Sequence, residues 1–575
     1  MAASKIESDK ALLQDLFQKW FRIPVYQRPY VWGREQIDDL LDDLTYAQQH
    51  APDDQYFLGS TVLQKNEPTA ARPYEEYDVL DGQQRMTTLL MLLAVLRDRT
   101  DDEDVKNAVT PLIHKKGSKT LKTPSRFRLM AENREEVRIF MTAHVEAAGG
   151  TLLQKELQEQ REDKRQDTSV RNMARAVLEI QGYFDRRQDV DLGEFSTFLL
   201  TQVLLIYVST ENLDDAFRLF TILNNRGLPL RNSDILKAQN LGELQGEADK
   251  TKYAKFWEKL DSELGDDIDR FLAYLRTILV KDKARLGLIR EFEDKIFGGK
   301  LNSPVLMAKG LPMLQFIERY KKHYDQLLTG NNHLEGQGYA FDNLVAVMQE
   351  GLPGTDWVPP LLLFYDKFKE EQLLVFLRLL DRKFSADLML GEAPTTRIEN
   401  MNTVLKAIEK ATTAQEVISH AQVFSYSADK LLELLGAKIY GRRFAKYLLL
   451  KLDYLLQDHL VVRVRLGGAI SIEHILPQTP ASTSTWVKDF SQAERETYTN
   501  WLGNLVLIGR AKNSSLGRLD FSEKIKRYFD KAISISPNSV RTLHSRPKWT
   551  PVELVKNQEE VLAILQKHYL LKPAP

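Results

Sequence analysis

The sequence of 575 residues contains no cysteine. This absence excludes disulfides, thiol nucleophiles, cysteine-ligated zinc and iron–sulfur clusters. It also fits a reducing cytoplasm, which is the compartment that we expect. A long apolar run is missing as well, because the longest uncharged apolar stretch, 198–210, falls short of the roughly 20 residues that span a membrane. Residues 1–10 are polar and lack the apolar core of a signal peptide, so we expect no membrane partner.

An excess of charge of one sign is also missing. Lys and Arg number 79 against 80 Asp and Glu, which gives a formal net charge of -1. This balance argues against a protein that binds nucleic acid through its overall charge, but not against a local basic patch. Residues 461–550 carry 14 Lys or Arg and 7 Asp or Glu. Such a basic segment is expected where a protein contacts phosphates, although a solvated basic face has the same composition.

The length favours two to four domains, and the apolar patterns divide the chain into three regions. Short β-type runs and helical patterns mix over 1–242, which predicts an α/β domain. Helical periodicity dominates 243–436 and predicts a helical connector. Over 437–575, a helix at 442–456 precedes a strand-like segment at 460–472, and loops and helices follow. The expected fold class is therefore α+β, multidomain and rich in helix.

The strongest chemical pattern comes at the end of the strand-like segment. Glu473 and His474 are adjacent there, and Asn504 and Asn513 lie downstream. A neutral imidazole can take a proton from water near neutral pH, and the resulting hydroxide can attack a phosphodiester. Carboxylate and amide oxygens suit Mg²⁺ or Mn²⁺, which would stabilise the charge that builds on the phosphate. Taken singly, His474 is more often a packed or surface histidine, and Asn513 an ordinary loop residue.

Taken together, these residues resemble the HNH, or His-Me finger, nucleases. In that family a Glu/Asp-His-Ile-x-Pro segment ends the first strand of a ββα unit, and asparagines nine positions apart follow, as Asn504 and Asn513 do here. The resemblance implies that His474 is the general base and that Asn504 orients it. It also implies that Glu473 and Asn513 are metal ligands. Because many members have a second histidine where Asn513 stands, we expect an oxygen-liganded Mg²⁺ or Mn²⁺ rather than zinc.

A helix expected at 521–529 looks like the one that closes the HNH unit. Lys524 and Arg527 on this helix are available to a DNA phosphate. An amphipathic helix with ordinary surface charges fits the same residues.

The N-terminal region begins with a motif rich in aromatic residues, Ile-Pro-Val-Tyr-Gln-Arg-Pro-Tyr-Val-Trp at 23–32. Its two prolines favour extended neighbours, so the motif predicts an ordered loop or an edge strand. The side chains either line a cavity or anchor the loop. Those singled out as candidates are Tyr26, Gln27, Arg28 and Trp32.

A second motif combines a strand at 77–80, the turn Asp81-Gly82-Gln83-Gln84-Arg85 and a following helix. This order presents free backbone N–H groups and the positive end of the helix dipole to an anion. Arg85 adds a guanidinium that can bind two phosphate oxygens. A capped helix without a ligand would also have Asp and Gly at this place.

A third motif spans 217–237. It predicts a helix that ends at a glycine, a loop, and a second helix capped by Asn232 or Ser233. Asn225 and Arg226 stand at the end of the first helix, where polar side chains can face a cleft. The sequence contains no Walker A motif, so a nucleotide site in this protein is not a P-loop.

These three motifs in this order, followed by the nuclease pattern, resemble the GmrSD-type, modification-dependent (type IV) restriction enzymes, which include SspE and BrxU. The resemblance covers 1–110, 200–240 and 440–575. It implies a ParB/sulfiredoxin-like N-terminal domain that binds and hydrolyses nucleoside triphosphates, and an HNH-like nuclease domain of the ββα-metal type. The residues that it places around the phosphates are Asp81, Gly82, Gln83, Gln84 and Arg85, completed by Asn225 and Arg226. The residues that it places at the nucleotide or at a cavity sensing modified DNA are Tyr26, Gln27, Arg28 and Trp32.

The resemblance therefore implies an NTP-dependent or NTP-regulated DNA endonuclease that restricts modified phage DNA in bacterial defence. Its cofactors would be Mg²⁺ or Mn²⁺ and GTP, ATP or UTP. Its partner would be double-stranded DNA, and the resemblance does not decide whether the protein forms a homodimer. The alternatives are a nucleotide-regulated DNA-binding or adaptor protein with a vestigial nuclease site, and an NTPase that works chiefly as a switch. Glucosylated hydroxymethylcytosine, another modified cytosine and phosphorothioate linkages all remain candidates for the modification.

Overall fold

A computed structural model describes residues 6–24, 27–69, 72, 74–118, 120, 124–131, 134–210, 231–298, 304–329, 337–464, 470–509, 517–529, 536–544 and 546–571. The chain forms two compact units, which we call the N-terminal unit (Met1–Asp269 with Lys309–Leu311) and the C-terminal unit (Arg270–Ala308 with Pro312–Pro575). The division into three domains expected from the sequence stays a prediction, since one compact unit can hold more than one domain. None of the helices in the described ranges is long and apolar enough to cross a bilayer.

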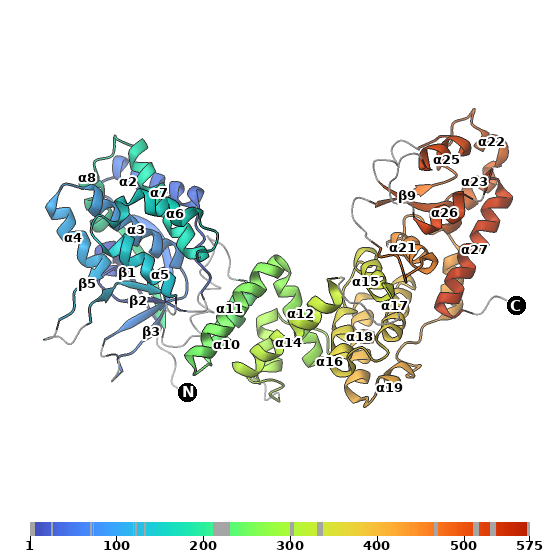
Figure 1. Cartoon of the computed structure of the whole chain (residues 1–575), viewed down its shortest axis with the longest axis horizontal. Helices are drawn as coiled ribbons and strands as arrows, with labels where there is room; N and C mark the ends of the chain where they lie inside the picture. Colours follow the sequence, from blue (N-terminus) through green and yellow to red (C-terminus); the bar gives the residue numbers. More distant parts are fainter. Residues whose placement is uncertain are drawn as a thin grey trace. The chain divides into compact units, whose positions relative to one another are not determined.

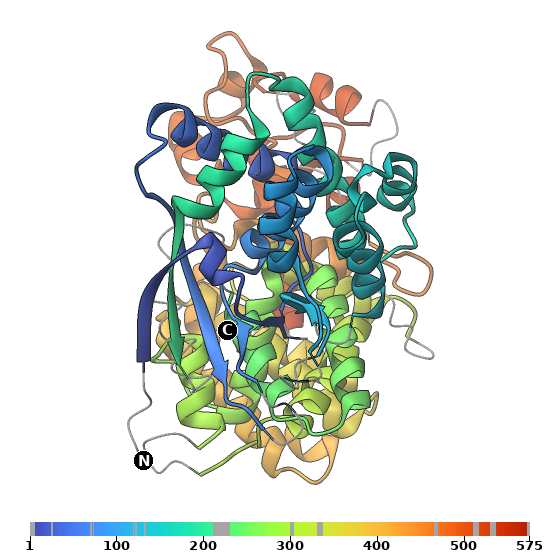
Figure 2. The same cartoon turned by 90° about the vertical axis from the view of Figure 1, so that its left-hand side faces the viewer.

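The N-terminal unit is built on a mixed β-sheet (Figure 2). Its strands are β1 (Ile6–Leu12), β2 (Phe21–Ile23), β3 (Tyr56–Asn66), β4 (Glu76–Val79), β7 (Leu129–Ala131) and β8 (Val203–Thr210). They lie in the order β1-β8-β3-β4-β2-β7, with β8 parallel to β3 and β2 parallel to both β4 and β7. A separate two-stranded sheet joins β5 (His114–Lys115) and β6 (Arg126–Phe127). The strands predicted around 77–80 and 203–208 are confirmed as β4 and β8.

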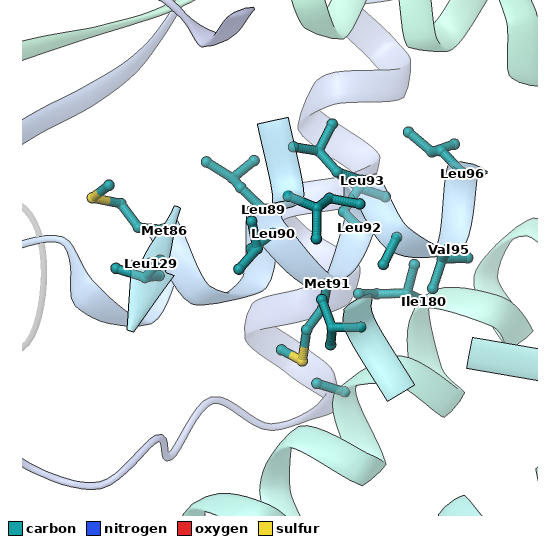
Figure 3. Packing of buried hydrophobic residues seen from close by; sticks show 14 of the residues in the cluster. Met86, Leu89, Leu90, Met91, Leu92, Leu93, Val95, Leu96, Leu129 and Ile180 are labelled. Atoms are coloured by element: carbon teal, nitrogen blue, oxygen red, sulfur yellow. The ribbon is translucent and has the colours of Figure 1, made fainter. Parts of the chain in front are cut away.

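Helices surround this sheet and extend the unit (Figure 1). They are α1 (Leu13–Leu16), α2 (Arg34–His50), α3 (Gln83–Arg99), α4 (Glu103–Ile113), α5 (Glu135–Met141), α6 (Gln154–Glu162), α7 (Thr168–Arg186), α8 (Leu192–Thr201), α10 (Asn232–Gly242) and α11 (Glu247–Leu264). α3 is the helix expected after the turn at 81–85. All its side chains from Met86 to Leu96 are buried, so the helix runs through the core (Figure 3). Leu129 and Ile180 belong to the same cluster of buried side chains.

The C-terminal unit is mostly helical. Its helices are α12 (Ile268–Val280), α13 (Leu288–Glu291), α14 (Leu311–Leu328), α15 (Ala340–Gly351), α16 (Val358–Phe368), α17 (Leu373–Met389), α18 (Pro394–Lys410), α19 (Ala414–Ile418), α20 (Ala428–Gly436), α21 (Ala445–Leu456), α22 (Thr485–Asp489), α23 (Gln492–Tyr498), α25 (Phe521–Phe529), α26 (Pro537–Leu543) and α27 (Pro551–Tyr569). Strands β9 (Ile470–His474) and β10 (Leu505–Gly509) form an antiparallel pair. Between 243 and 436, every regular element in the described ranges is a helix, as the periodicity predicts.

The prediction of a strand at 460–472 is wrong in its first part, because the described residues Leu460–Val464 are not in a strand. A buried side chain replaces the strand partner there. The amide of Asn343 in α15 donates to the Val462 carbonyl at 2.9 Å and accepts the Val464 N–H at 2.7 Å. These bonds satisfy the backbone locally, so this β-branched segment needs no sheet.

A fully buried ion pair joins distant helices of the C-terminal unit. Lys451 in α21 donates to Asp381 in α17 at 2.7 Å, and neither side chain is exposed to solvent. The Tyr447 hydroxyl donates to the other carboxylate oxygen at 2.7 Å, and the His568 ring in α27 lies 3.3 Å from the carboxylate. Burial alone would raise the pKa of Asp381, but Lys451 and His568 hold it at about 2. This network ties α27, at the C-terminal end, to the helices of the middle region.

A second buried carboxylate in α21 predicts a measurable pH dependence. Asp453 accepts the Asn538 N–H at 2.8 Å at the start of α26, and burial raises its pKa to about 6. The folded state therefore binds a proton that the unfolded state has released, and stability falls as the pH rises from about 4 to about 6. We expect Asp453→Asn to stabilise the C-terminal unit by on the order of 1–3 kcal/mol near neutral pH.

The measurement is the difference in free energy of unfolding between Asp453→Asn and the wild type, taken across this pH range. The difference should shrink as the solution becomes more acidic. A difference that does not change with pH would rule out titration of Asp453 as its cause.

Candidate functional sites

The turn between β4 and α3 has a shape that requires glycine. Gly82 has a φ of +89°, and a Cβ atom at this position would lie 2.8 Å from Thr61 Oγ1. The Thr61 hydroxyl donates to the Asp81 carbonyl, which fixes the turn against β3. No side chain in the described part of the chain caps the helix, so its first N–H groups face the turn with the positive end of the helix dipole. The strand, turn and helix start expected from the sequence are confirmed.

We expect Gly82→Ala to destabilise the N-terminal unit by about 1–3 kcal/mol, because both the positive φ and the contact with Thr61 oppose a side chain. Gly149→Ala is the matched control, since Gly149 has a φ of +78° and nothing within 4 Å of an added Cβ. Urea unfolding of both variants separates the backbone strain from the contact. Equal losses of stability would show that the Thr61 contact has no effect.

The two glutamines of this turn bind the backbone of the aromatic-rich motif. Gln83 Nε2 donates to the Arg28 carbonyl at 2.9 Å, and Gln84 Nε2 donates to the Pro29 carbonyl at 3.0 Å. Gln84 Oε1 also accepts the Val31 N–H at 2.8 Å. The first and second motifs are therefore one site in space. The sequence did not reveal that these amides hold a neighbouring loop, because the bonded residues are more than fifty positions apart.

Two other residues of the aromatic-rich motif are also fixed. Gln27 is buried and donates through Nε2 to the Leu80 carbonyl at 3.0 Å. Trp32 is partly buried and packs against the core of the unit. These contacts anchor the loop at its two ends. Of the residues predicted for the N-terminal site, Tyr26, Asn225 and Arg226 lie outside the described ranges.

Charged groups without ion-pair partners gather at the turn. The Arg85 guanidinium donates to the Ser60 carbonyl at 3.1 Å and lies over the β-bulge at Gly59, where a Cβ atom would approach it to 2.7 Å. Burial lowers the pKa of Arg85 and raises that of Asp81, and the two groups attract each other. Within the described residues neither Arg85 nor Arg28 forms an ion pair within 4 Å, so both guanidinium groups have donors to offer an anion.

The start of α10 differs by one position from the expectation. Asn232 or Ser233 was predicted as the cap, but Arg231 is the N-cap residue, and Asp234 accepts the Arg231 N–H at 3.2 Å. The Asn232 amide and the Ser233 N–H instead bind Asp269, at 2.7 and 3.1 Å. The reason is that an acid in the first turn can cap the helix from inside it.

The candidate catalytic histidine lies at the end of β9. His474 pairs with Leu505 across the antiparallel sheet, is 8% exposed and packs edge-on against the Tyr440 ring at 4.2 Å. Its Nε2 lies 3.2 Å from Asn500 Oδ1, an amide that sequence reasoning missed. Burial lowers the pKa of His474 to about 4, so the ring is neutral near neutral pH. With Nε2 donating to Asn500, the lone pair is left on Nδ1, which has no hydrogen-bond partner in the described structure.

The acid beside this histidine is paired with a lysine. Lys524 in α25 is buried and donates to Glu473 Oε1 at 2.6 Å and to the His474 carbonyl at 2.6 Å. Burial raises the pKa of Glu473, and the Lys524 ammonium opposes this effect. The helix predicted at 521–529 is confirmed as α25. Lys524 was expected to face a phosphate, and here it holds the carboxylate.

Asn504 is fully buried and fixes the backbone beyond the histidine. Its side chain accepts the Leu476 N–H at 2.8 Å and donates to the Leu476 carbonyl at 3.0 Å and the Thr499 carbonyl at 2.8 Å. The Ile475 N–H donates to the Asn504 carbonyl at 2.9 Å. These bonds close the segment that connects β9 and β10 at its two ends and hold His474 at the strand terminus.

The donors available to a divalent metal are of the right chemical type but incomplete. Glu473 offers carboxylate oxygens, one of which is bonded to Lys524, and Asn513 lies outside the described residues. Across the described ranges, no group of three or more His, Asp or Glu side chains gathers as a metal site. Arg527 on α25 is exposed.

The comparisons with known proteins match two segments of the chain. The family model for the N-terminal domain of GmrSD restriction endonucleases matches residues 10–241, and that for the C-terminal domain matches residues 425–564. No curated protein matches the chain. The two matched segments follow each other in the chain as the two domains follow in the family, and together they hold both candidate sites. The chain therefore belongs to the GmrSD family of restriction endonucleases.

Proposed function

We propose that this restriction endonuclease cuts modified DNA in bacterial defence at an HNH-type site in its C-terminal unit. The proposal also holds that a nucleoside triphosphate in the N-terminal unit controls the cutting. The observation that carries it is the position of His474, a buried neutral imidazole at the end of β9 within the segment matched by the C-terminal family model. The cytoplasm is the proposed compartment.

In this proposal, His474 Nδ1 takes a proton from the attacking water while Nε2 stays bonded to Asn500. Asn500 and Asn504 act as positioning residues, since one orients the ring and the other holds the strand end. Glu473 and Asn513 would hold Mg²⁺ or Mn²⁺, which when bound stabilises charge on the cleaved phosphate. Arg527, which is exposed on α25, would contact a phosphate of the double-stranded DNA.

For the nucleotide, the proposal assigns the phosphates to the turn at the start of α3. Arg28 and Arg85 supply positive charge, and the uncapped N-terminus of the helix supplies backbone donors. Gln83 and Gln84 shape the site by holding the loop that carries Arg28. Asp81 and Gly82 set the turn, and Asn225 and Arg226 stay candidates from the family resemblance.

The test is a cleavage assay on plain DNA, DNA with glucosylated hydroxymethylcytosine, DNA with another modified cytosine, and phosphorothioate DNA. Each is incubated with Mg²⁺ or EDTA, and with or without GTP, ATP or UTP. We expect cutting of one modified substrate with Mg²⁺ only, at a rate that the nucleotide changes. Cutting of plain DNA at the same rate would contradict recognition of a modification. A cutting rate that no nucleotide changes would contradict regulation of the nuclease by a nucleotide.

One observation favours a second candidate function, that of a nucleotide-regulated DNA-binding or adaptor protein with a vestigial nuclease site. The bond from Lys524 to Glu473 occupies an oxygen that a metal would need. If no substrate is cut under any of these conditions while modified DNA is bound, this second function replaces the first.

A further inference from the structure

Lys237 in α10 is a buried cation to which no other described residue is bonded. Its side chain is 4% exposed, and within the described structure its ammonium makes no hydrogen bond and no ion pair within 4 Å. Burial lowers its pKa to about 8, a shift that nearby carboxylates oppose only in part. A buried ammonium without a bonded partner is unfavourable, so such a group is expected where a ligand completes its contacts.

The carboxylates around Lys237 are Glu258, Asp261 and Asp234, and none of them bonds its ammonium. Glu258 accepts Arg134 at 2.6 Å, and Asp261 accepts Arg231 at 2.5 Å. Lys237 interacts with both acids electrostatically but bonds neither. Asp234 accepts the backbone N–H of Arg231 at 3.2 Å, so within the described residues Lys237 is the cation of this cluster that no carboxylate binds.

This cluster adjoins the turn at the start of α3. Arg28 interacts electrostatically with Asp81 in that turn and with Asp234 in α10, one helical turn before Lys237. Arg134, which shares the cluster with Lys237, also donates to the Gln27 carbonyl at 3.2 Å. The segment that carries Arg28 therefore lies between the turn on one side and α10 with α11 on the other, all within the N-terminal unit.

We propose that Lys237 is a phosphate-binding residue of the nucleotide site and acts with Arg28 and Arg85. This inference rests on the nucleotide site under the proposed function. All three cations lack an ion pair in the described structure, whereas the neighbouring Arg134 and Arg231 are paired. A triphosphate is the ligand that fits, because it presents several negative oxygens along a chain and can contact all three cations. A nucleoside monophosphate offers too few oxygens to do so.

The test measures binding of inorganic triphosphate, nucleoside monophosphates and the β,γ-imido analogues of GTP, ATP and UTP by calorimetry. We expect Lys237→Met and Lys237→Gln to weaken triphosphate binding by about 10- to 100-fold, and monophosphate binding less. Lys237→Arg should recover part of the loss. The control is Lys259→Met, since Lys259 is on α11 with a side chain that is 74% exposed, and it should bind as the wild type does.

Each result has a clear meaning. If the wild type binds no triphosphate, the proposed nucleotide site fails, and this inference fails with it. If Arg85→Ala abolishes binding while Lys237→Met binds as the wild type does, only the inference is overturned. Thermal unfolding without ligand is recorded in parallel. Equal weakening in all three Lys237 variants with a lower unfolding temperature would make Lys237 structural and overturn the inference as well.

Discussion

His474→Ala is expected to lower the rate of DNA cleavage by about 100- to 10,000-fold, the range for losing a general base. The expectation follows from the geometry at the end of β9. The ring is neutral, and its Nε2 bond to Asn500 leaves Nδ1 as the proton acceptor. Alanine removes the acceptor and leaves the strand pairing intact, since that pairing uses backbone atoms.

Four measurements make this prediction specific. DNA binding by His474→Ala should match the wild type, and the variant should still unfold cooperatively, with some loss of stability because a buried ring is removed. His420→Ala, which removes an exposed histidine from the same unit, should cut at the wild-type rate. Asn500→Ala should lose about 10-fold, because the base stays present but is no longer oriented. Wild-type cleavage by His474→Ala would remove this residue from the mechanism.

The second large effect concerns stability. We expect Lys451→Met to lower the free energy of unfolding of the C-terminal unit by about 3–5 kcal/mol. The variant leaves the Asp381 carboxylate buried and without its ammonium, and neither side chain of the wild-type pair has any exposure with which water could compensate. The same size of effect is expected for Asp381→Asn, which leaves the Lys451 ammonium buried without its carboxylate.

The double variant Asp381→Asn with Lys451→Met separates the charge from the packing. It removes both charges while the asparagine oxygen can still accept the Tyr447 hydroxyl, so it should recover most of the loss. Lys322→Met is the control, because Lys322 is 73% exposed in its pair with Glu318 and its loss should stay within about 0.5 kcal/mol. Urea unfolding measures the free energy of unfolding of the four variants and of the wild type. Additive losses in the double variant would mean that packing, and not the unpaired charge, causes the effect.

The local parts of both sites could be predicted from the sequence. The turn at Gly82, the helix after it and the placement of His474 at a strand end depend on residues close together in the chain. Glycine, strand and helix signals carry that information within a few positions. The helix that carries Lys524 was predicted for the same reason.

The pairings across the sites could not be predicted. Asn500 contacts His474 from 26 positions away, and Lys524 contacts Glu473 from 51 positions away. No local sequence pattern indicates that Lys237 is left without a bonded carboxylate. Such contacts follow from how the elements pack, which no short pattern encodes. Asn343 is a further example, since its amide holds Val462 and Val464 out of a sheet that their β-branched side chains predict.

Because α3 is completely buried, hydrogen exchange of its backbone amides can report when the N-terminal unit opens. Backbone amides in a helix with no solvent-exposed face exchange with deuterium only when the surrounding structure opens. From Met86 to Leu96 the side chains are buried, so these amides should be among the last of their unit to exchange. Residues Leu448–Leu452 of α21 have the same property in the C-terminal unit. Hydrogen exchange at these two segments therefore measures the opening of each unit separately, in one experiment on the whole chain.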